Sequence, residues 1–374
     1  MNRLVLNLEP NALAYGFFPT GKQAPMQQGC IEDIRTDVTI SDALKQILSQ
    51  IESGDCPFPV ESVALHVAAS GDLFRSHTVA TPSIIEKLKS YVPFAPMHMP
   101  VVLELIECCS LCLPGRPVAL FFETAFFTKL PAREYLYAIN PDALAGAGIR
   151  RYGYHGLFHE AATRAARASL GEKLNRPAKI VSVCLEPHPE VAAICGTEPV
   201  MISGGATPLE GLPGQTSCGE IDSGVLLTLS RKEQWGPEQL NQLLTQQSGM
   251  VALAGRPVTI EEVLLSKEAD LLLAKQVLEY RILLRAGMAL AAMDGFDQIV
   301  FSGRYAATGK VLGPWLQERL PSTGKSNQPV WKCYENSLMR IMAEQLDFVL
   351  QMNPTPGRAK ARAARPCLIK EPTQ

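Results

Sequence analysis

The chain lacks long hydrophobic runs and has little charge of either sign. No apolar stretch reaches the length of a membrane span, and the first residues, with Asn2, Arg3 and Glu9 around a short apolar segment, lack the pattern of a signal peptide. A formal net charge of -2 provides no basic field for nucleic acid. We therefore expect a cytoplasmic protein that binds neither a membrane nor nucleic acid.

Cysteines at metal-ligand spacing are also missing, although the chain has ten cysteines. Cys108, Cys109 and Cys112 lie in an amphipathic stretch typical of a helix, and no second Cys/His pair stands at a zinc-like distance. We interpret these cysteines as small buried side chains in a reducing compartment.

Two segments far apart in the chain begin alike. An apolar strand, residues 3–10, closes on Leu-Glu-Pro and is followed by a second strand, residues 12–18; residues 178–187 close on the same three letters and are followed by residues 190–195. A length of 374 residues suits two domains. The sequence therefore predicts two α/β domains that arose by duplication.

Further elements follow from periodicity and capping residues. A helix is expected over residues 41–52 with Ser41 as its N-cap, and another begins at Thr81-Pro82-Ser83. The remaining expectations are a buried strand at 63–69, a strand at 118–127 that carries Glu123 at its carboxyl end, a long helix at 269–293 and a strand at 296–303.

A polar turn lies between the two halves. Residues 150–159 contain two arginines, two glycines and two histidines, which is typical of neither a core strand nor an ordinary helix. We expect a tight turn that leads into a helix starting near Glu160. A turn of this composition is typical of a functional site.

This turn resembles the signature R-R-Y-G-F-H-G-T-S-H of the acetate kinase family, with Leu157 and Phe158 in place of its Thr and Ser. Five more segments resemble family motifs in the same order: 94–100 (L-A-P-L-H-N-P), 118–127 (V-F-D-T-A-F-H), 203–211 (T-S-M-G-F-T-P-L-E-G), 219–222 (G-D-I-D-P) and 296–303 (D-x-I-V-F-T-G-G). Several motifs in the right order are more specific than any one of them.

The resemblance implies a fold and a division into domains. The fold would be α/β, the duplicated ribonuclease-H-like two-domain fold of acetate and sugar kinases and actin, with an interdomain cleft. Residues 1–148 plus about 334–352 would form the N-terminal domain, residues 149–333 the C-terminal nucleotide-binding domain, and residues 353–374 a basic flexible tail. The family is dimeric, so a homodimer is expected.

The resemblance also implies an activity, the transfer of the γ-phosphoryl group of ATP, with Mg²⁺, to a short carboxylic acid such as acetate, propionate or butyrate. His155 would then contact the phosphoryl group, Glu123 would lie near the metal, and His66 stands where the family has its first site arginine. The other implied site residues are Met97, Tyr154, Pro208 and Ala68 for the acid, Gly204, Gly205, Gly303 and Arg304 for the nucleotide, and Asn7 and Glu335 for the metal.

Several positions depart from the family pattern and leave three hypotheses open. Ser217, like His66, replaces a site arginine, and a guanidinium fork is what grips phosphoryl oxygens. Leu-Glu-Pro replaces a phosphate loop in both halves, and proline removes an N–H. The chain is thus a carboxylate kinase, a catalytically impaired relative with a regulatory, metabolite-binding or scaffold role, or a kinase for another acceptor. In that last case the missing cation would come from Arg75, Arg304 or Lys310.

Overall fold

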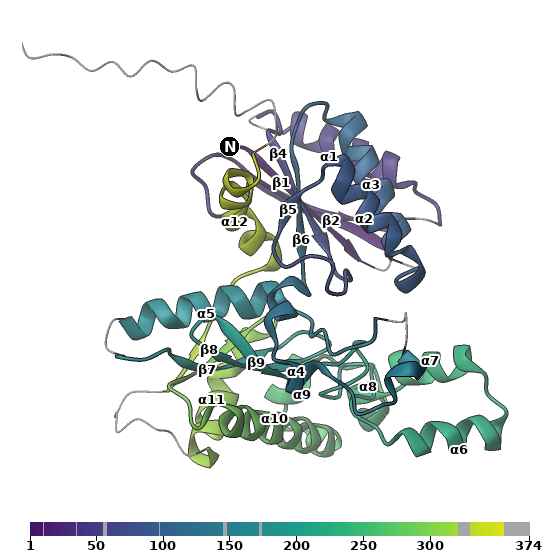
Figure 1. Ribbon diagram of the computed structural model, residues 1–374, viewed down its shortest axis with the longest axis vertical. Helices are drawn as coiled ribbons and strands as arrows, with labels where there is room; N and C mark the ends of the chain where they lie inside the picture. The colour runs from purple at the N-terminus through teal and green to yellow at the C-terminus, as the bar shows by residue number, and fades with distance from the viewer. Residues whose placement is uncertain are drawn as a thin grey trace, which may run out of the picture. The chain divides into compact units, whose positions relative to one another are not determined.

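The computed structural model describes residues 1–9, 11–34, 36–54, 58–96, 98–144, 148–171, 174–320 and 330–354 (Figure 1). The chain forms two compact units. The first contains residues 1–67, 76–121 and 342 onward, and the second contains residues 68–75 and 122–341. The functional division into a domain of 1–148 with 334–352 and a nucleotide-binding domain of 149–333 stays a prediction. Residues 355–374, most of the predicted tail, lie outside the described residues.

The first unit is built on a six-stranded sheet in the order β3-β2-β1-β4-β6-β5. Its strands are β1 Arg3–Glu9, β2 Ala12–Phe18, β3 Gln27–Ile31, β4 Ser62–Val67, β5 Thr78–Val79 and β6 Val118–Phe122. The first three strands form an antiparallel meander, and β4 runs parallel to β1 on its other side. The two strands expected at the start of the chain are therefore confirmed.

Helices cover both faces of this sheet. They are α1 Ile40–Glu52, α2 Pro82–Ser90, α3 Met99–Cys112 and α12 Leu338–Met352. Figure 1 shows α1, α2 and α3 on one side of the sheet and α12 on the other. The expected N-cap Ser41 is wrong, because α1 begins at Ile40 and Thr39 Oγ1 accepts the Asp42 N–H at 3.1 Å. Thr81 caps α2 as expected, with Pro82 at the first helical position.

The second unit repeats the strand order of the first. Its sheet has the order β11-β10-β7-β8-β9, with β7 Lys179–Cys184, β8 Glu190–Cys195, β9 Glu198–Ile202, β10 Gln298–Ser302 and β11 Trp331–Cys333. Again an antiparallel meander, β7 to β9, comes first, and the next strand runs parallel to the first strand of that meander. The duplication expected from the sequence is thus present in the topology.

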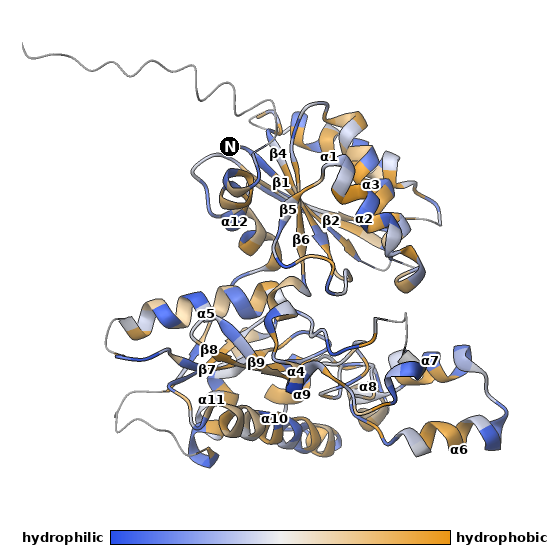
Figure 2. Cartoon of the chain, viewed as in Figure 1, coloured by the Kyte–Doolittle hydropathy of each residue, from blue (hydrophilic) through white to orange (hydrophobic). Residues whose placement is uncertain are grey.

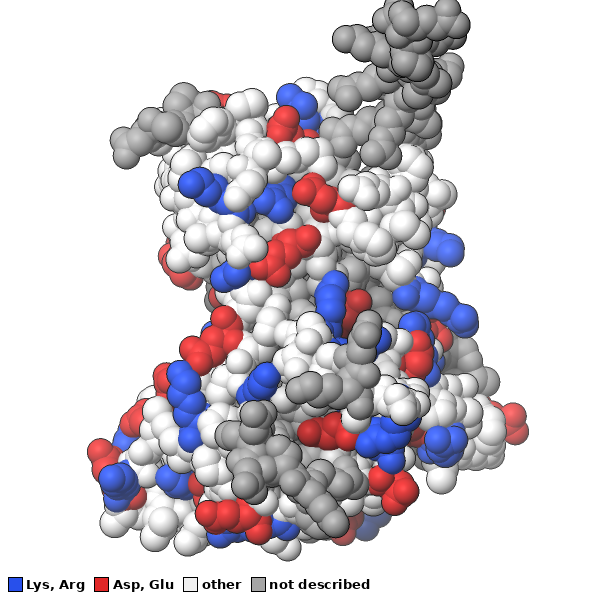
Figure 3. Space-filling model, turned by 90° about the vertical axis from the view of Figure 1, so that its left-hand side faces the viewer, with Lys and Arg blue, Asp and Glu red and all other residues white. Residues whose placement is uncertain are grey.

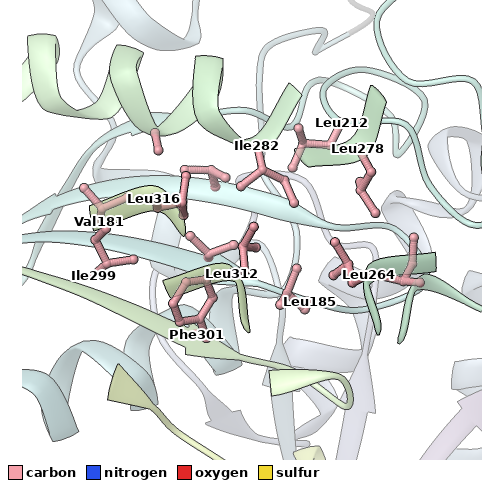
Figure 4. Close-up of a cluster of buried hydrophobic side chains, with 14 of the residues drawn as sticks. Val181, Leu185, Leu212, Leu264, Leu278, Ile282, Ile299, Phe301, Leu312 and Leu316 are labelled. Atoms are coloured by element: carbon pink, nitrogen blue, oxygen red, sulfur yellow. The ribbon is translucent and has the colours of Figure 1, made fainter. Parts of the chain in front are cut away.

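Both faces of the second sheet are buried. The helices of this unit are α4 Ala132–Tyr135, α5 Gly156–Leu170, α6 Ser223–Glu233, α7 Pro237–Gln246, α8 Gly249–Ala254, α9 Ile260–Leu265, α10 Leu272–Met293 and α11 Gly309–Arg319. Val181 of β7 packs with Ile282 of α10 and Leu316 of α11 (Figure 4), whereas Ile180 packs on the opposite face with Ala162 of α5. The alternation along β7 follows from the two-residue period of a strand.

The surface carries no single-sign field on the face that Figure 3 presents, where Lys and Arg side chains are interspersed with Asp and Glu. Within the described ranges, no helix combines the length and the apolar content that a membrane crossing requires. Cys108 and Cys109 are buried, in agreement with their interpretation as small core side chains, and Cys112 is half-buried. Cys30, in contrast, is exposed on β3.

Candidate functional site

The polar turn of residues 150–159 lies in the second unit and feeds α5. The helix begins at Gly156, four residues earlier than the expected start near Glu160. His155 is the N-cap residue and adopts a left-handed conformation with φ 53°. At Gly156 an added Cβ would lie 2.0 Å from the backbone oxygen of Glu123, so only glycine fits. The glycine therefore allows the start of α5 to lie directly against the backbone of Glu123.

The imidazole of His155 is fixed by a backbone group. Its Nε2 lies 3.0 Å from the carbonyl oxygen of His188. A carbonyl oxygen can only accept, so Nε2 carries a hydrogen and donates it. In the neutral ring Nδ1 is then an acceptor, and it becomes a donor only when His155 is positively charged. This arrangement couples any hydrogen bond donated from Nδ1 to protonation of the ring.

Glu123 lies beside the same turn. It follows β6 directly, and its side chain is buried. The strand expected to reach residue 127 is shorter, because it ends at Phe122 and Ala125–Lys129 form a 3₁₀ helix. Its Oε2 accepts the N–H of Leu157, in the first turn of α5, at 3.1 Å. A carboxylate is stabilised at this position because the first N–H groups of a helix point out of it with a partial positive charge. Glu123 and His155 are thus brought together by the start of one helix.

A second buried carboxyl group, that of Glu190, accepts a hydrogen bond from the backbone of the turn. Both of its carboxyl oxygens lie about 3 Å from the N–H of Tyr154, at 3.1 and 3.0 Å. Its Oε2 is 3.5 Å from Nε2 of His159, whose Nδ1 is 2.8 Å from Ser182 Oγ. Sequence reasoning missed Glu190 as a site residue. The available signal was a charged residue at the start of the otherwise apolar strand β8.

His188 and Ser217 form a pair next to His155. His188 Nδ1 lies 2.9 Å from the hydroxyl oxygen of the buried Ser217. Burial, and to a smaller extent the neighbouring His155, lower the pKa of His188, so its ring is neutral near pH 7. Ser217, expected at the position of a family arginine, therefore contacts an imidazole. No local sequence pattern indicates this pair, because the two residues are 29 positions apart.

Two expected nucleotide residues lie at the end of β10. Gly303 has φ 89°, and an added Cβ would lie 2.5 Å from the carbonyl oxygen of Leu185. The N–H of Arg304 donates to Glu186 Oε1 at 2.6 Å, and its Nε donates to Oε2 at 2.8 Å. The turns that follow β7 and β10 are therefore joined to each other.

The other expected nucleotide residues are explained by packing. An added Cβ at Gly204 would lie 1.8 Å from Glu190 Oε1, and one at Gly205 would lie 2.1 Å from Glu210 Oε2. The Tyr154 hydroxyl donates to the carbonyl oxygen of Ala206 at 2.9 Å, so this loop also holds the Tyr154 ring. The roles of Gly204 and Gly205 in nucleotide binding stay predictions.

Two other residues expected to bind the acid in this unit are not fully buried. Pro208, in the same loop as Ala206, is exposed, and Ala68 is half-buried. Met97 lies outside the described residues. Their roles in binding an acid also stay predictions.

The two other expected site residues of the first unit lie on neighbouring strands. Asn7 is on β1 and half-buried, opposite Ala14 of β2. His66 is buried on β4 and interacts electrostatically with His98, the residue before α3. Burial, followed by the effect of His66, lowers the pKa of His98 to about 4.

Two of the cations considered for another acceptor are already paired in the second unit. Lys310 Nζ lies 2.8 Å from Glu335 Oε1, and Arg304 is bound to Glu186. Glu335, expected as a metal ligand, therefore has its carboxylate paired with Lys310, and its role at a metal stays a prediction. Arg75 is exposed.

Comparison with known proteins identifies the chain's relatives. The model of the acetokinase family matches residues 21–309. The acetate kinase of Halothermothrix orenii is 29% identical over 337 residues, which cover 81% of this chain and 83% of that protein. The acetate kinase of Thermoanaerobacter pseudethanolicus is 32% identical over 273 residues, which cover 71% of this chain and 67% of that protein.

Solved structures show the same fold. The acetate kinase of Porphyromonas gingivalis superimposes with a TM-score of 0.82 at 24% identity, covering 93% of this chain and 99% of that one. A propionate kinase from Francisella tularensis gives a TM-score of 0.79 at 19% identity, covering 92% and 98%. The expected two-domain α/β fold of the acetate kinases is thereby confirmed. The chain belongs to the acetokinase family.

Proposed function

We propose that this protein is a kinase that uses Mg·ATP to phosphorylate a short-chain carboxylic acid such as acetate, propionate or butyrate. The observation that carries the proposal is the start of α5, where His155 is held in a left-handed conformation beside the buried Glu123. Catalysis of phosphoryl transfer consists mostly of positioning and electrostatic stabilisation. A histidine and a carboxylate fixed by one helix start are suited to both tasks.

The residues present fit Mg²⁺ better than they fit the nucleotide phosphates. Mg²⁺ in kinases is held by one or two protein carboxylates together with substrate phosphates, and Glu123 offers one carboxylate. In the described residues no three His, Cys, Asp or Glu side chains gather into a metal cluster, so the ion would be held largely through the nucleotide. The turn at Arg304 already holds the Glu186 carboxylate. Bound Mg·ATP would supply the phosphoryl group and neutralise its charge.

The chain's own residues would then orient the acid and stabilise the phosphoryl group. His155 donates from Nδ1 to a phosphoryl oxygen when its ring is protonated, while Nε2 stays on the His188 carbonyl. Tyr154, held by Ala206, would contact the apolar end of the acid, with Ala68 and Pro208. Each role is tested by the activity of single variants.

The test is acyl phosphate formation by purified protein with Mg·ATP and each of the three acids, trapped with hydroxylamine. We expect a signal that falls about a hundredfold or more in His155→Ala, because one lost donor to the developing charge costs that much. His77→Gln is the matched control, since His77 belongs to the first unit, where its ring packs on Phe121. A signal equal in wild type and His155→Ala would contradict the assigned role of His155.

A second candidate function is a non-catalytic one, a relative that keeps the fold and binds a metabolite or a partner protein. Ser217 contacts His188 where a guanidinium is expected, and Glu186 binds the backbone N–H and the Nε of Arg304. Both observations reduce the positive charge available to a phosphoryl group. A folded protein that yields no acyl phosphate with any of the three acids would favour this candidate.

We also propose that the protein is a homodimer, with α10 at the interface. Ala274, Leu278 and Ile282 bury one face of this helix in the core, yet the opposite face is apolar as well, and it is exposed. That face, termed the outer stripe, comprises Leu273, Tyr280, Leu284 and Met288. A helix that is apolar all round is normally covered on both sides.

Helix α6 supports the same proposal, and Glu220, two residues before its N-cap, pairs with Arg285 of α10. Among its eleven residues none is buried, although Val225 and Leu227 are large and apolar (Figure 2). An isolated helix of this length is marginal in water and depends on packing for its stability. A second copy would cover both helices, as is common in closed homodimers.

A further inference from the structure

The turns after β7 and β10 form one joined structure at the edge of the second sheet. The two strands are parallel neighbours, with Cys184 opposite Ser302, so their carboxyl ends lie together. The N–H of Leu185 donates to the Ser302 oxygen at 2.7 Å, and the N–H of Tyr305 donates to the Leu185 oxygen at 3.0 Å. In open α/β sheets, ligands bind at the carboxyl ends of the strands.

The Glu186 carboxylate occupies the donors of this structure. Its two oxygens accept from the backbone N–H of Arg304 at 2.6 Å and from the Arg304 Nε at 2.8 Å. The Glu186 side chain is 8% exposed, whereas that of Arg304 is 56% exposed. The anion is thus inside the turn, and the guanidinium reaches from it toward solvent.

A backbone N–H beside a guanidinium is the donor set that binds phosphate and carboxylate anions. We propose that Arg304 forms an anion site for the phosphate groups of a nucleotide, and that Glu186 fills this site and sets its affinity for phosphorylated ligands. The nucleotide as ligand rests on the proposed function. The role of Glu186 is supported by its two contacts with Arg304 and does not depend on the proposed function.

The presence of Glu186 has a direct consequence for binding. A phosphate that approaches the Arg304 N–H meets a carboxylate already there, and two anions at hydrogen-bond distance repel each other. Pro187, the next residue, has no N–H with which to compensate. Phosphate groups should therefore add little to the affinity of the wild-type protein.

The experiment is calorimetric titration of the purified full chain with pyrophosphate and with ADP. We expect weak binding to wild type and roughly tenfold or tighter binding to Glu186→Ala and Glu186→Gln, since removing a like charge beside an anion is worth at least that factor. Glu318→Gln, which removes an exposed charge on α11 of the same unit, is the matched control and should bind like wild type. In Glu186→Ala combined with Arg304→Ala, the gain should shrink.

Two further measurements decide what the gain means. Adenosine, which has no phosphate, should bind wild type and Glu186→Gln equally. Folding is checked by circular dichroism, and Glu186→Gln, which keeps the side-chain shape, decides if Glu186→Ala is unstable. Unchanged or weaker pyrophosphate and ADP binding in a folded Glu186→Gln would overturn the proposal.

The outcome is separable from that of the acyl phosphate test. A gain in ADP affinity without acyl phosphate from any variant would support the masked anion site and contradict the kinase activity. Acyl phosphate from wild type without any gain in Glu186→Gln would support the kinase and overturn the masked site.

Discussion

Burial shifts the pKa values of the neighbouring residues Glu190 and His159 in opposite directions. Burial raises the pKa of Glu190 well above its ordinary value, although the N–H of Tyr154 opposes the shift, and burial lowers the pKa of His159 to about 3. Ionisation of Glu190 is therefore disfavoured in the folded protein, and the imidazole of His159 is neutral near pH 7. The Glu190 carboxyl group holds Tyr154, the neighbour of His155, so the position of the turn depends on a buried carboxyl group.

The two residues give opposite slopes of stability against pH. The unfolded chain protonates His159 below its ordinary pKa of 6.5, whereas the folded chain does so only near 3, so the free energy of unfolding falls as pH is lowered through that window. Glu190 ionises above its ordinary pKa of 4.5 in the unfolded chain, whereas burial raises its pKa well above that value in the folded chain. Its contribution therefore falls as pH rises above 4.5 toward the raised pKa.

Glu190→Gln should remove the second of these slopes. The amide keeps the size of the side chain and an oxygen that accepts the Tyr154 N–H, but it cannot ionise. We expect the urea midpoint of the variant to decline less than that of wild type as the pH rises above the ordinary pKa of 4.5, measured by circular dichroism at a series of pH values. Glu198→Gln, at an exposed glutamate of β9, should follow wild type. Parallel curves for Glu190→Gln and wild type would contradict a raised pKa of Glu190.

At the scale of elements, the ends were harder to predict than the elements themselves. Composition predicted the turn at 150–159 and a following helix. It did not predict a helix start at Gly156, because glycine has a low helix propensity and the left-handed conformation of His155 has no signal in the sequence. The helix begins at Gly156 because the close contact with the Glu123 oxygen fixes it there. Similarly, α1 begins before Ser41 because Thr39 forms the capping hydrogen bond. Both starts are decided by a single contact.

Gly156→Ala should therefore be strongly destabilising. Its Cβ would lie 2.0 Å from the backbone oxygen of Glu123, so the backbone at Glu123 or the start of α5 must move. We expect a loss of about 2 kcal/mol or more in the free energy of unfolding, the range of overpacked or strained core sites. Gly54→Ala is the control, because a methyl there meets its neighbours only at 3.5 Å and beyond. Equal urea midpoints for the two variants would show that α5 tolerates a displaced start.

At the scale of the whole molecule, duplication was predictable and the site was only partly so. The repeated strand, Leu-Glu-Pro and returning strand indicated two similar halves, and both sheets indeed share the order of five strands. The motifs also indicated His155 and Glu123, which are neighbours in the structure. Contacts between distant positions, such as Glu190 with Tyr154 and Arg304 with Glu186, depend on strand pairing, which no local pattern encodes.

The assembly of the molecule gives the last prediction, which concerns the outer stripe of α10. Glutamates at Leu273 and Leu284 would place charges in an apolar interface, where they lose hydration without gaining a partner. We expect sedimentation velocity to show a dimer for wild type and a monomer for Leu273→Glu combined with Leu284→Glu, both folded by circular dichroism. Leu111→Glu on α3, at a leucine that is 75% exposed, should stay dimeric. A monomeric wild type would contradict the homodimer, whereas a double variant that stays dimeric would move the interface away from α10.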